Sequence, residues 1–200
     1  MTRTRRYGDL DRETVVSAAL RVGSKVGFDA LSMRNLADEL GVSPMTSYRY
    51  VPGKRALLDL VIDAVLEGVE VPPPSAGTWD ERLRMLERSV RRELRRYPGL
   101  REQLTRPTPH ATRLADAAIG ILLEAGFDDA TATLAFSALY AYMLGQLEID
   151  ENAAASRARP RRRNAFSGVA PRAEPLHPDD IFEFGFDLML DALRRKLPAR

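Results

Sequence analysis

Apolar residues recur along most of this chain at the three- and four-residue spacing of a helix. No stretch alternates between apolar and polar residues as a half-buried strand would. A first helix is predicted between a cap at Asp11 and a stop at Gly27. Its buried face is expected to consist of Val15, Ala19, Val22 and Val26. The pattern therefore predicts an all-α fold.

Two short helices joined by a tight turn are predicted next. Ser32 is a suitable cap for the first, and Gly41 supplies the left-handed residue that a tight turn needs. Ser43 can cap the second, with Pro44 at the first helical position, where its missing N–H costs nothing. This second helix is expected to run to about Tyr50. The spacing is typical of a helix-turn-helix, in which the second helix enters the major groove of DNA.

A fourth helix opens at Lys54 and ends near Gly68. Its buried face is expected to consist of Leu57, Leu58, Val61, Ile62 and Val65. The Pro-rich segment 71–77 follows, and such a composition favours a joint between domains. We therefore expect a small domain over residues 1–71 and a larger helical domain over 72–200.

The larger domain is predicted to contain helices over 78–97, 108–125 and 128–149, and a last helix from Pro178. The helix over 128–149 and the last helix carry apolar residues on more than one face, which indicates burial against several neighbours or a second subunit. Between them, residues 151–176 are rich in Ala, Arg, Ser and Pro. This segment is predicted to be a mobile loop.

The 200-residue composition limits the chemistry of the chain, because it contains no cysteine and two distant histidines. Disulfides and thiol nucleophiles are thereby excluded. We expect His110 to be a surface residue and His177 a helix-start residue, neither with a partner. No Ser-His-Asp set, metal-ligand cluster or phosphate-binding glycine loop is evident, so an enzyme, a metal and a cofactor are not expected. The polar opening residues favour a cytoplasmic protein without a membrane segment.

The charge of the chain is uneven. Up to Arg55 there are ten Lys and Arg against six Asp and Glu, a net +4, while the remainder has twenty against twenty-two, a net −2. A basic N-terminal segment favours a polyanionic partner, although such a charge is also common on ordinary surfaces. The basic run Arg157–Arg163 is interpreted as a solvated part of the loop.

The second short helix carries side chains that suit a DNA groove. Arg49 can bond guanine with two donors, and Met45 and Thr46 can touch a thymine methyl group. The candidates for phosphate contacts are Tyr48, Tyr50 and Lys54. No acidic residue stands three or four positions from Arg49 or Lys54. The alternative is that the two short helices simply pack together, with the tyrosines as half-buried core residues.

At these residues the chain resembles the TetR family of bacterial repressors, in its tetracycline-repressor branch. The likeness covers residues 11–66 well, and its strongest segments are Ser32–Leu36, Leu40–Val42, Tyr48–Tyr50 and Lys54–Asp59. A weaker likeness continues through Thr78–Trp79, Thr105–Pro107, Gly126–Phe127, Leu144–Gly145 and Phe184–Gly185. The resemblance implies a homodimer that represses by binding a palindromic operator in double-stranded DNA and is released by a small-molecule effector. It implies a subunit interface formed by the helices around Leu144 and Phe186.

The resemblance also implies the DNA contacts, position by position. They are Arg34, Ser43, Pro44, Met45, Thr46, Tyr48, Arg49, Tyr50 and Lys54. Arg49 stands where the family usually has an aromatic residue, so the preferred operator sequence is expected to differ. The remaining alternative for function is an architectural helical DNA-binding protein without effector control.

The family's drug-contacting polar positions do not carry over to this chain. They fall on Leu86, Glu102, Ala118 and Ile149, so tetracycline with magnesium is not expected as the effector. A pocket would instead suit a larger and more apolar molecule, with one charged group for Arg106 or Glu102. The predicted ligand-binding residues are Leu86, Val90, Glu102, Arg106, Phe136 and Tyr140. The alternative, which is favoured for each apolar member taken alone, is that it is ordinary core.

Overall fold

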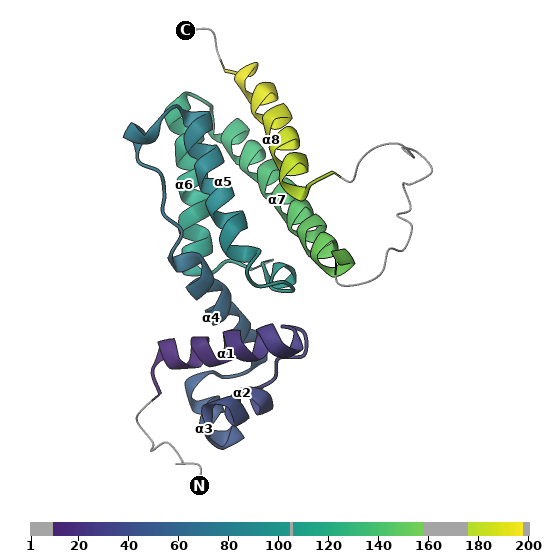
Figure 1. The fold of residues 1–200 in the computed structure, drawn as a ribbon. Coiled ribbons are helices and arrows are strands. Elements are labelled where there is room, and N and C mark those ends of the chain that lie inside the picture. Colours follow the sequence, from purple (N-terminus) through teal and green to yellow (C-terminus); the bar gives the residue numbers. More distant parts are fainter. Residues whose placement is uncertain (1–9, 105, 158–175, 198–200) are drawn as a thin grey trace. The chain divides into compact units, whose positions relative to one another are not determined.

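The computed structural model describes residues 10–104, 106–157 and 176–197, and every regular element among them is helical (Figure 1). The predicted all-α class is confirmed. The α-helices are α1 (Arg12–Val26), α2 (Met33–Leu40), α3 (Pro44–Tyr50), α4 (Lys54–Glu67), α5 (Trp79–Leu94), α6 (Pro109–Ala125), α7 (Asp129–Arg157) and α8 (Pro178–Arg194). Two 3-10 turns, η1 (Pro74–Ala76) and η2 (Arg101–Gln103), lie in the connections. Within the described ranges, none of the helices has the length and apolarity to cross a bilayer.

The chain forms two compact units. The first contains the residues up to Glu70 together with Arg92–Leu114, and the second contains Val71–Arg91 together with the residues from Ala115 onward. Helix α6 thus begins in the first unit and continues in the second. The domain boundary between residues 71 and 72 stays a prediction.

Local capping explains where the first helices begin and end. The Asp11 carboxylate accepts a hydrogen bond from the Thr14 N–H at 2.7 Å. The Ser32 hydroxyl accepts from the Asn35 N–H at 3.2 Å, while the Asn35 side chain accepts from the Ser32 N–H at 2.7 Å. Gly41 ends α2 in the left-handed conformation, with φ 68°. The caps predicted at Asp11, Ser32 and Gly41 are therefore confirmed.

The first unit has a continuous apolar core whose fully buried side chains include Phe28, Leu31, Leu36, Leu57 and Ile62. One predicted core residue of α1 is wrong, because Val26 is 51% exposed. Val26 is the last residue of α1, and the chain turns at Gly27 with φ 88°. The ring of Phe28 packs against Gly23 and fills the space beside the end of the helix.

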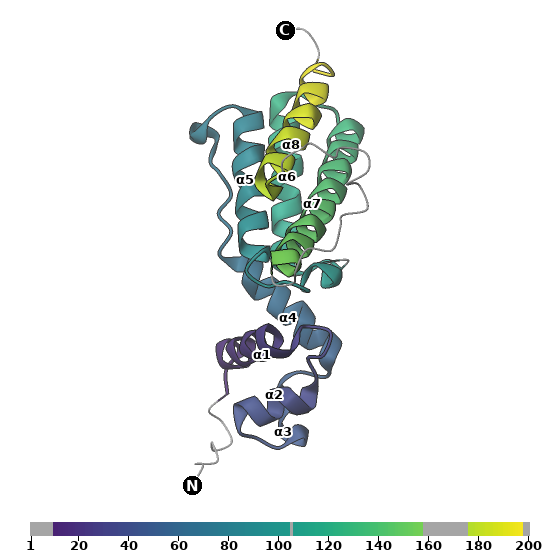
Figure 2. The ribbon, with the colours of Figure 1, turned by 45° about the vertical axis from the view of Figure 1, so that its right-hand side comes forward.

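The second unit is a set of helices in alternating directions. Helices α5 and α7 run in one direction, and α6 and α8 run in the other (Figures 1 and 2). The Tyr142 hydroxyl on α7 donates to the carbonyl oxygens of Ile181 and Phe182 on α8, at 3.0 and 2.9 Å. Gly185 lies against the Tyr142 side chain, where a Cβ would clash. A hydroxyl and a glycine thus set how closely α7 and α8 approach.

Two predicted boundaries are wrong. Helix α7 continues to Arg157, so residues 151–157 are helical rather than part of a mobile loop. The reason is local, since Ala153, Ala154 and Ala155 favour a helix strongly. The rest of the predicted loop, residues 158–175, and most of the basic run lie outside the described residues. Helix α5 ends at Leu94 rather than near residue 97, where the chain forms a turn instead.

Replacing Gly23 with alanine should destabilise the protein, because the new methyl group would overlap the buried Phe28 ring. We expect the free energy of unfolding in urea to fall by about 1–3 kcal/mol. Gly120→Ala on α6 is the matched control, because an added Cβ there meets nothing within 4 Å. It should raise the same quantity by about 0.5–1 kcal/mol. Equal effects of the two substitutions would contradict this account of Gly23.

Candidate functional site

Helix α3 is anchored by its cap and by one serine. The Ser43 hydroxyl accepts from the Thr46 N–H at 3.1 Å, and Pro44 occupies the first turn, as predicted. Ser47 is the buried residue of α3, at 1% exposure, and its hydroxyl donates to the Pro44 carbonyl at 2.7 Å. The same hydroxyl lies 3.5 Å from the carbonyl oxygen of Met33 on α2. Helix α3 therefore packs against α2 through the side that carries Ser47.

Most of the other side chains of α3 are directed into solvent. Met45 is 80% exposed, Tyr48 53% and Tyr50 36%, and Arg49 is exposed as well. Thr46 is half-buried. The alternative in which the two tyrosines belong to the core is therefore wrong. Large apolar and aromatic side chains gathered on one exposed helix are typical of a binding surface.

Two further predicted DNA-binding residues lie at the starts of helices. Arg34 is exposed in the first turn of α2, and Lys54 is the exposed first residue of α4. The Lys54 ammonium donates to the carbonyl oxygen of Asp29 in the turn after α1. No side chain caps α4, whose N-cap is Gly53. Lys54 thus holds the start of α4 against the turn that precedes α2.

A buried carboxylate on α4, Asp63, was not singled out from the sequence. It accepts from the Arg12 guanidinium on α1 and from the backbone N–H of His110 on α6, both at 2.8 Å. The Nδ1 atom of His110 lies 3.1 Å from Asp63 Oδ2. The expectation that neither histidine has a partner is therefore wrong, since the Nδ1 atom of His177 also accepts from the Asp179 N–H at 3.3 Å. One sequence signal was available, a single acid within an otherwise apolar run of α4.

The pKa of Asp63 lies below its ordinary value of 3.8. Burial acts to raise this pKa, but the hydrogen bonds that the carboxylate accepts, those from His110 first, outweigh that effect. The ionised form of Asp63 is therefore the form that the fold stabilises.

The six predicted ligand-binding residues divide between the two units. Glu102 and Arg106 are exposed in the first unit, where the Arg106 guanidinium lies 3.6 Å from the Asp59 carboxylate. The other four lie in the second unit. Of these, Leu86 and Val90 on α5 are buried.

The aromatic members of this set, Phe136 and Tyr140, are half-buried neighbours on α7. Their rings stack with centroids 6.0 Å apart. Burial raises the pKa of Tyr140 above its ordinary value, so its hydroxyl stays protonated and able to donate.

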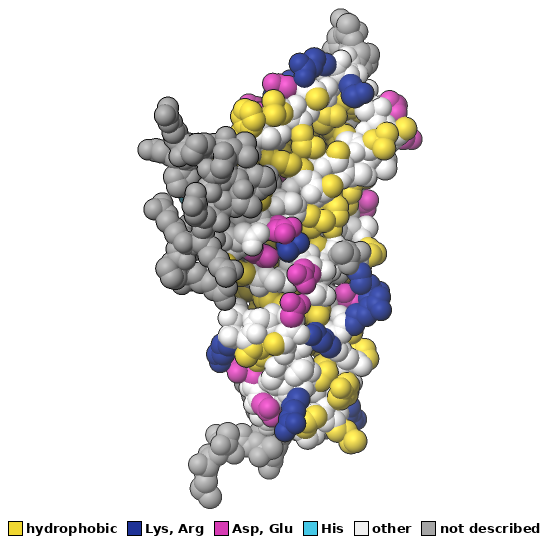
Figure 3. All heavy atoms as spheres, turned by 90° about the vertical axis from the view of Figure 1, so that its right-hand side faces the viewer, with side chains coloured by type: hydrophobic (Ala, Val, Ile, Leu, Met, Phe, Trp, Pro, Cys, Tyr) yellow, Lys and Arg dark blue, Asp and Glu magenta, His cyan; other side chains and the backbone are white. Residues whose placement is uncertain are grey.

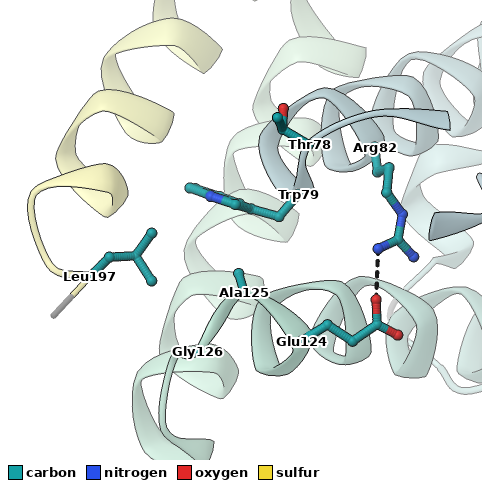
Figure 4. A pocket seen from close by; sticks show the side chains of 7 residues that line it. All are labelled: Thr78, Trp79, Arg82, Glu124, Ala125, Gly126 and Leu197. Atoms are coloured by element: carbon teal, nitrogen blue, oxygen red, sulfur yellow. Dashed lines mark hydrogen bonds and ion pairs between the residues drawn. The ribbon is translucent and has the colours of Figure 1, made fainter. Parts of the chain in front are cut away.

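A groove of about 580 Å³ lies elsewhere in the second unit (Figure 4). It is lined by Thr78, Trp79, Arg82, Glu124, Ala125, Gly126 and Leu197. The Arg82 guanidinium donates to the Glu124 carboxylate across it at 2.6 Å, and Trp79 meets Phe127 edge-on with centroids 5.4 Å apart. None of the six predicted ligand-binding residues lines this groove.

Apolar side chains are exposed on α7 and α8. Figure 3 views the side of the molecule that carries these helices, with hydrophobic side chains in yellow. Phe184 is 69% exposed and Leu188 56% exposed, one turn apart on α8, and Leu134 on α7 is 71% exposed. Phe186, by which the predicted interface was named, is 1% exposed and belongs to the core of its own unit. Phe184 and Leu188 occupy the outward side of α8 instead.

Two family models match the chain. The model of "Bacterial regulatory proteins, tetR family" matches residues 15–61, and the model of "Tetracyclin repressor-like, C-terminal domain" matches residues 71–197. A curated relative, the tetracycline repressor protein class A from transposon 1721 of Escherichia coli, is 32% identical over 206 aligned residues. That alignment covers 96% of this chain and 94% of the relative.

Solved structures of similar proteins share the fold over nearly the whole chain. A TetR variant of Acinetobacter baumannii AYE in complex with minocycline superposes with a TM-score of 0.76 at 28% identity, covering 96% of this chain and 100% of that one. ActR of Streptomyces coelicolor in complex with actinorhodin gives a TM-score of 0.79 at 25% identity, with the same coverage. The likeness therefore extends through both units.

Replacing Asp63 with asparagine should destabilise the first unit, because Arg12 and the His110 N–H would lose a charged acceptor. Since the folded-state pKa of Asp63 is lowered, its contribution is present above pH 3.8 and is lost as the pH falls through the folded value. We expect the free energy of unfolding at pH 7 to fall by about 1–3 kcal/mol, and this deficit to shrink in acid. Asp38→Asn, at an exposed position of α2, is the control. A deficit that does not change with pH would refute the electrostatic role.

Proposed function

This chain belongs to the TetR family of bacterial regulatory proteins and is a DNA-binding repressor controlled by a small-molecule effector, and from this premise we propose that α3 reads the operator. The observation that supports this proposal is the burial of α3. Ser47 is buried, whereas Met45, Tyr48 and Arg49 are exposed to solvent. A short exposed helix after a tight turn has the dimensions of an element that enters the major groove.

The proposed roles of the individual residues follow from their chemistry. Arg49 donates two hydrogen bonds to a guanine edge, and Met45 and Thr46 contact thymine methyl groups. Phosphate contacts hold the helix in place without reading the sequence. Other residues are proposed to contact DNA phosphates or to bring the start of a helix close to the DNA backbone. They are Arg34, Ser43, Pro44, Tyr48, Tyr50 and Lys54.

The subunit interface is proposed to form between α7 and α8 of two chains. The exposed side chains of Leu134, Phe184 and Leu188 would be removed from water there, which is favourable. A two-fold dimer presents two copies of α3, which can enter successive major grooves about 34–36 Å apart. The operator is accordingly proposed to be palindromic.

The effector is proposed to be a largely apolar molecule held by side chains of the second unit. Leu86, Val90, Phe136 and Tyr140 supply apolar surface and one donor hydroxyl. Glu102 and Arg106 remain candidates for a charged group of the effector. We propose that the protein acts by binding rather than by catalysis, and that it works in the cytoplasm.

Coupling between effector and DNA is proposed to pass through α6. This helix extends from the second unit into the first, where the His110 N–H bonds the carboxylate of Asp63 on α4. An effector that binds more tightly when α6 is in one position therefore also favours the positions of α4 and α1 that go with it. Linkage then requires that the effector and the operator weaken each other's binding by the same factor.

Selecting bound sequences from a random DNA pool tests the proposed function. The expected product is a palindrome whose half-sites are separated by about one helical turn. Affinity for the selected operator should exceed affinity for random DNA at every salt concentration. Comparable affinities for both would support the architectural alternative and contradict sequence-specific repression.

Two alanine substitutions should separate base reading from phosphate binding. Arg49→Ala should weaken operator binding by about 1–3 kcal/mol and relax the preference at one base position, because a bidentate contact is lost. Lys54→Ala should weaken binding to all DNA and reduce the salt dependence. Titration of labelled operator and random DNA measures both effects. Arg92→Ala, an exposed arginine on α5, is the control. Unchanged operator affinity in Arg49→Ala would refute its assigned role.

Placing charges on the outward side of α8 should separate the subunits. The double substitution Phe184→Glu with Leu188→Glu would put two carboxylates in the proposed apolar interface, where their desolvation is costly. Sedimentation equilibrium should then give the monomer mass, and operator affinity should fall. Leu123→Glu, at an exposed apolar position of α6, should leave the mass of the dimer unchanged. A double variant that remains dimeric would exclude this face of α8.

A further inference from the structure

Two buried oxygen atoms in the second unit lack a hydrogen-bond donor among the described residues. They are Oε2 of Glu87 on α5 and Oε1 of Gln146 on α7. Each of these residues is 5% exposed. Buried acceptors are nearly always satisfied, because an acceptor removed from water without a partner is energetically unfavourable. In its ionised form Glu87, like the amide of Gln146, presents an acceptor for which the described part of the chain supplies no donor.

The two residues occupy matching positions on facing helices. Arg91 on α5 holds Asp150 on α7 through hydrogen bonds from Nε at 2.9 Å and from Nη2 at 2.7 Å. Helices α5 and α7 run in the same direction (Figures 1 and 2). Glu87 and Gln146 each stand four residues before a member of this ion pair, on the same helix face. Both unpartnered oxygens therefore belong to the region between α5 and α7, one turn from the ion pair.

An aromatic cluster borders this region. The Phe182 ring lies over Phe186 with centroids 5.5 Å apart, and Tyr142 stacks on Phe182 at 6.1 Å. Tyr142 stands one turn before Gln146 on α7, and the Arg91 guanidinium lies 4.5 Å from the Phe182 centroid. Aromatic faces attract cations, most strongly where water is excluded. The Arg84 guanidinium likewise lies 5.4 Å from the Phe186 centroid, so this cluster already accommodates positive charge.

The other charged groups around Glu87 are already paired. On α5, Arg84 and Arg88 bond Glu183 of α8, and Arg91 bonds Asp150 and also Asp179. The buried side chains of α6 bear no charge and are Leu114, Ala118, Ile121 and Leu122. Burial raises the pKa of Glu87 to about 8, so the unliganded protein holds it mainly as a neutral acid at pH 7. A cation brought next to this carboxyl would favour its ionised form.

We propose that Glu87 and Gln146 are the polar anchor of the effector site, and that the effector carries a protonated amine beside an aromatic or apolar body. The ammonium donates one N–H to the Glu87 carboxylate and a second to Gln146 Oε1. The proton of Glu87 passes to solvent, so each amine bound at neutral pH releases up to one proton. This inference deepens the proposed function and rests on it.

A pair of probes with one carbon skeleton tests the inference. Phenylbutylamine is a cation at neutral pH, and phenylbutanol is uncharged. In calorimetric titrations of the full-length protein, the amine should bind with a Kd about tenfold lower than the alcohol, as a charge-assisted hydrogen bond implies. Glu87→Gln keeps the shape of the side chain and should bring the two Kd values together.

The controls separate loss of the site from loss of the fold. Asp116→Asn removes one exposed negative charge on α6 and should keep the preference for the amine. Glu87→Gln should melt at a temperature no lower than wild type at pH 7.5, because an unfavourably buried acid has been removed. For the wild type alone, the Kd of the amine should fall as the pH rises from 6 to 8, since the carboxylate becomes more populated.

Three results would overturn the inference: equal Kd values for the two probes in wild type, a preference that persists in Glu87→Gln, or binding of neither probe. Each would leave a bound water as the simplest donor to these oxygens. Operator titrations without probe distinguish this failure from failure of the proposed function. Wild type and Glu87→Gln should bind the selected operator with equal affinity. If neither protein binds any selected operator, the repressor assignment itself is rejected.

Discussion

The first unit depends on one buried carboxylate. Asp63 accepts from Arg12 on α1 and from the backbone of His110 on α6, and it is itself part of α4. Because a carboxylate taken out of water is tolerated only where donors replace the lost hydration, the three segments must keep their positions together. These contacts tie α1, α4 and the start of α6 to one another within the first unit.

The second unit uses the same principle with more charges. Arg91 joins α5 to α7 and α8 by bonding Asp150 and Asp179, and it also covers the face of the Phe182 ring. These contacts join three helices through charged side chains. Glu87 is the exception in this network, since it is as deeply buried as Arg91 but its Oε2 atom has no hydrogen-bond partner among the described residues. Buried polar atoms without a partner are rare in folded proteins, and buried groups with a shifted pKa are often found at functional sites.

Features that depend on neighbours in sequence were predictable. The caps at Asp11, Ser32 and Ser43 and the exposed side of α3 follow from residue types within one or two turns. Features that depend on distant partners were not. Asp63 and His110 are 47 residues apart, and no local pattern relates them. The extension of α7 beyond residue 149 was missed because a few polar residues concealed a strong local preference for helix. Phe184 and Phe186 both fit an apolar face, and the helix packing alone distinguishes the outward one.

The seven residues of α3 share almost nothing with the hydrophobic core, since Ser47 is the side chain buried from this helix. Substitutions at its exposed positions therefore change little that keeps the protein folded. Recognition of new target sequences can arise by drift at these positions without a compensating mutation elsewhere. Proteins that retain this scaffold can consequently acquire different regulons more easily than they can acquire a different core.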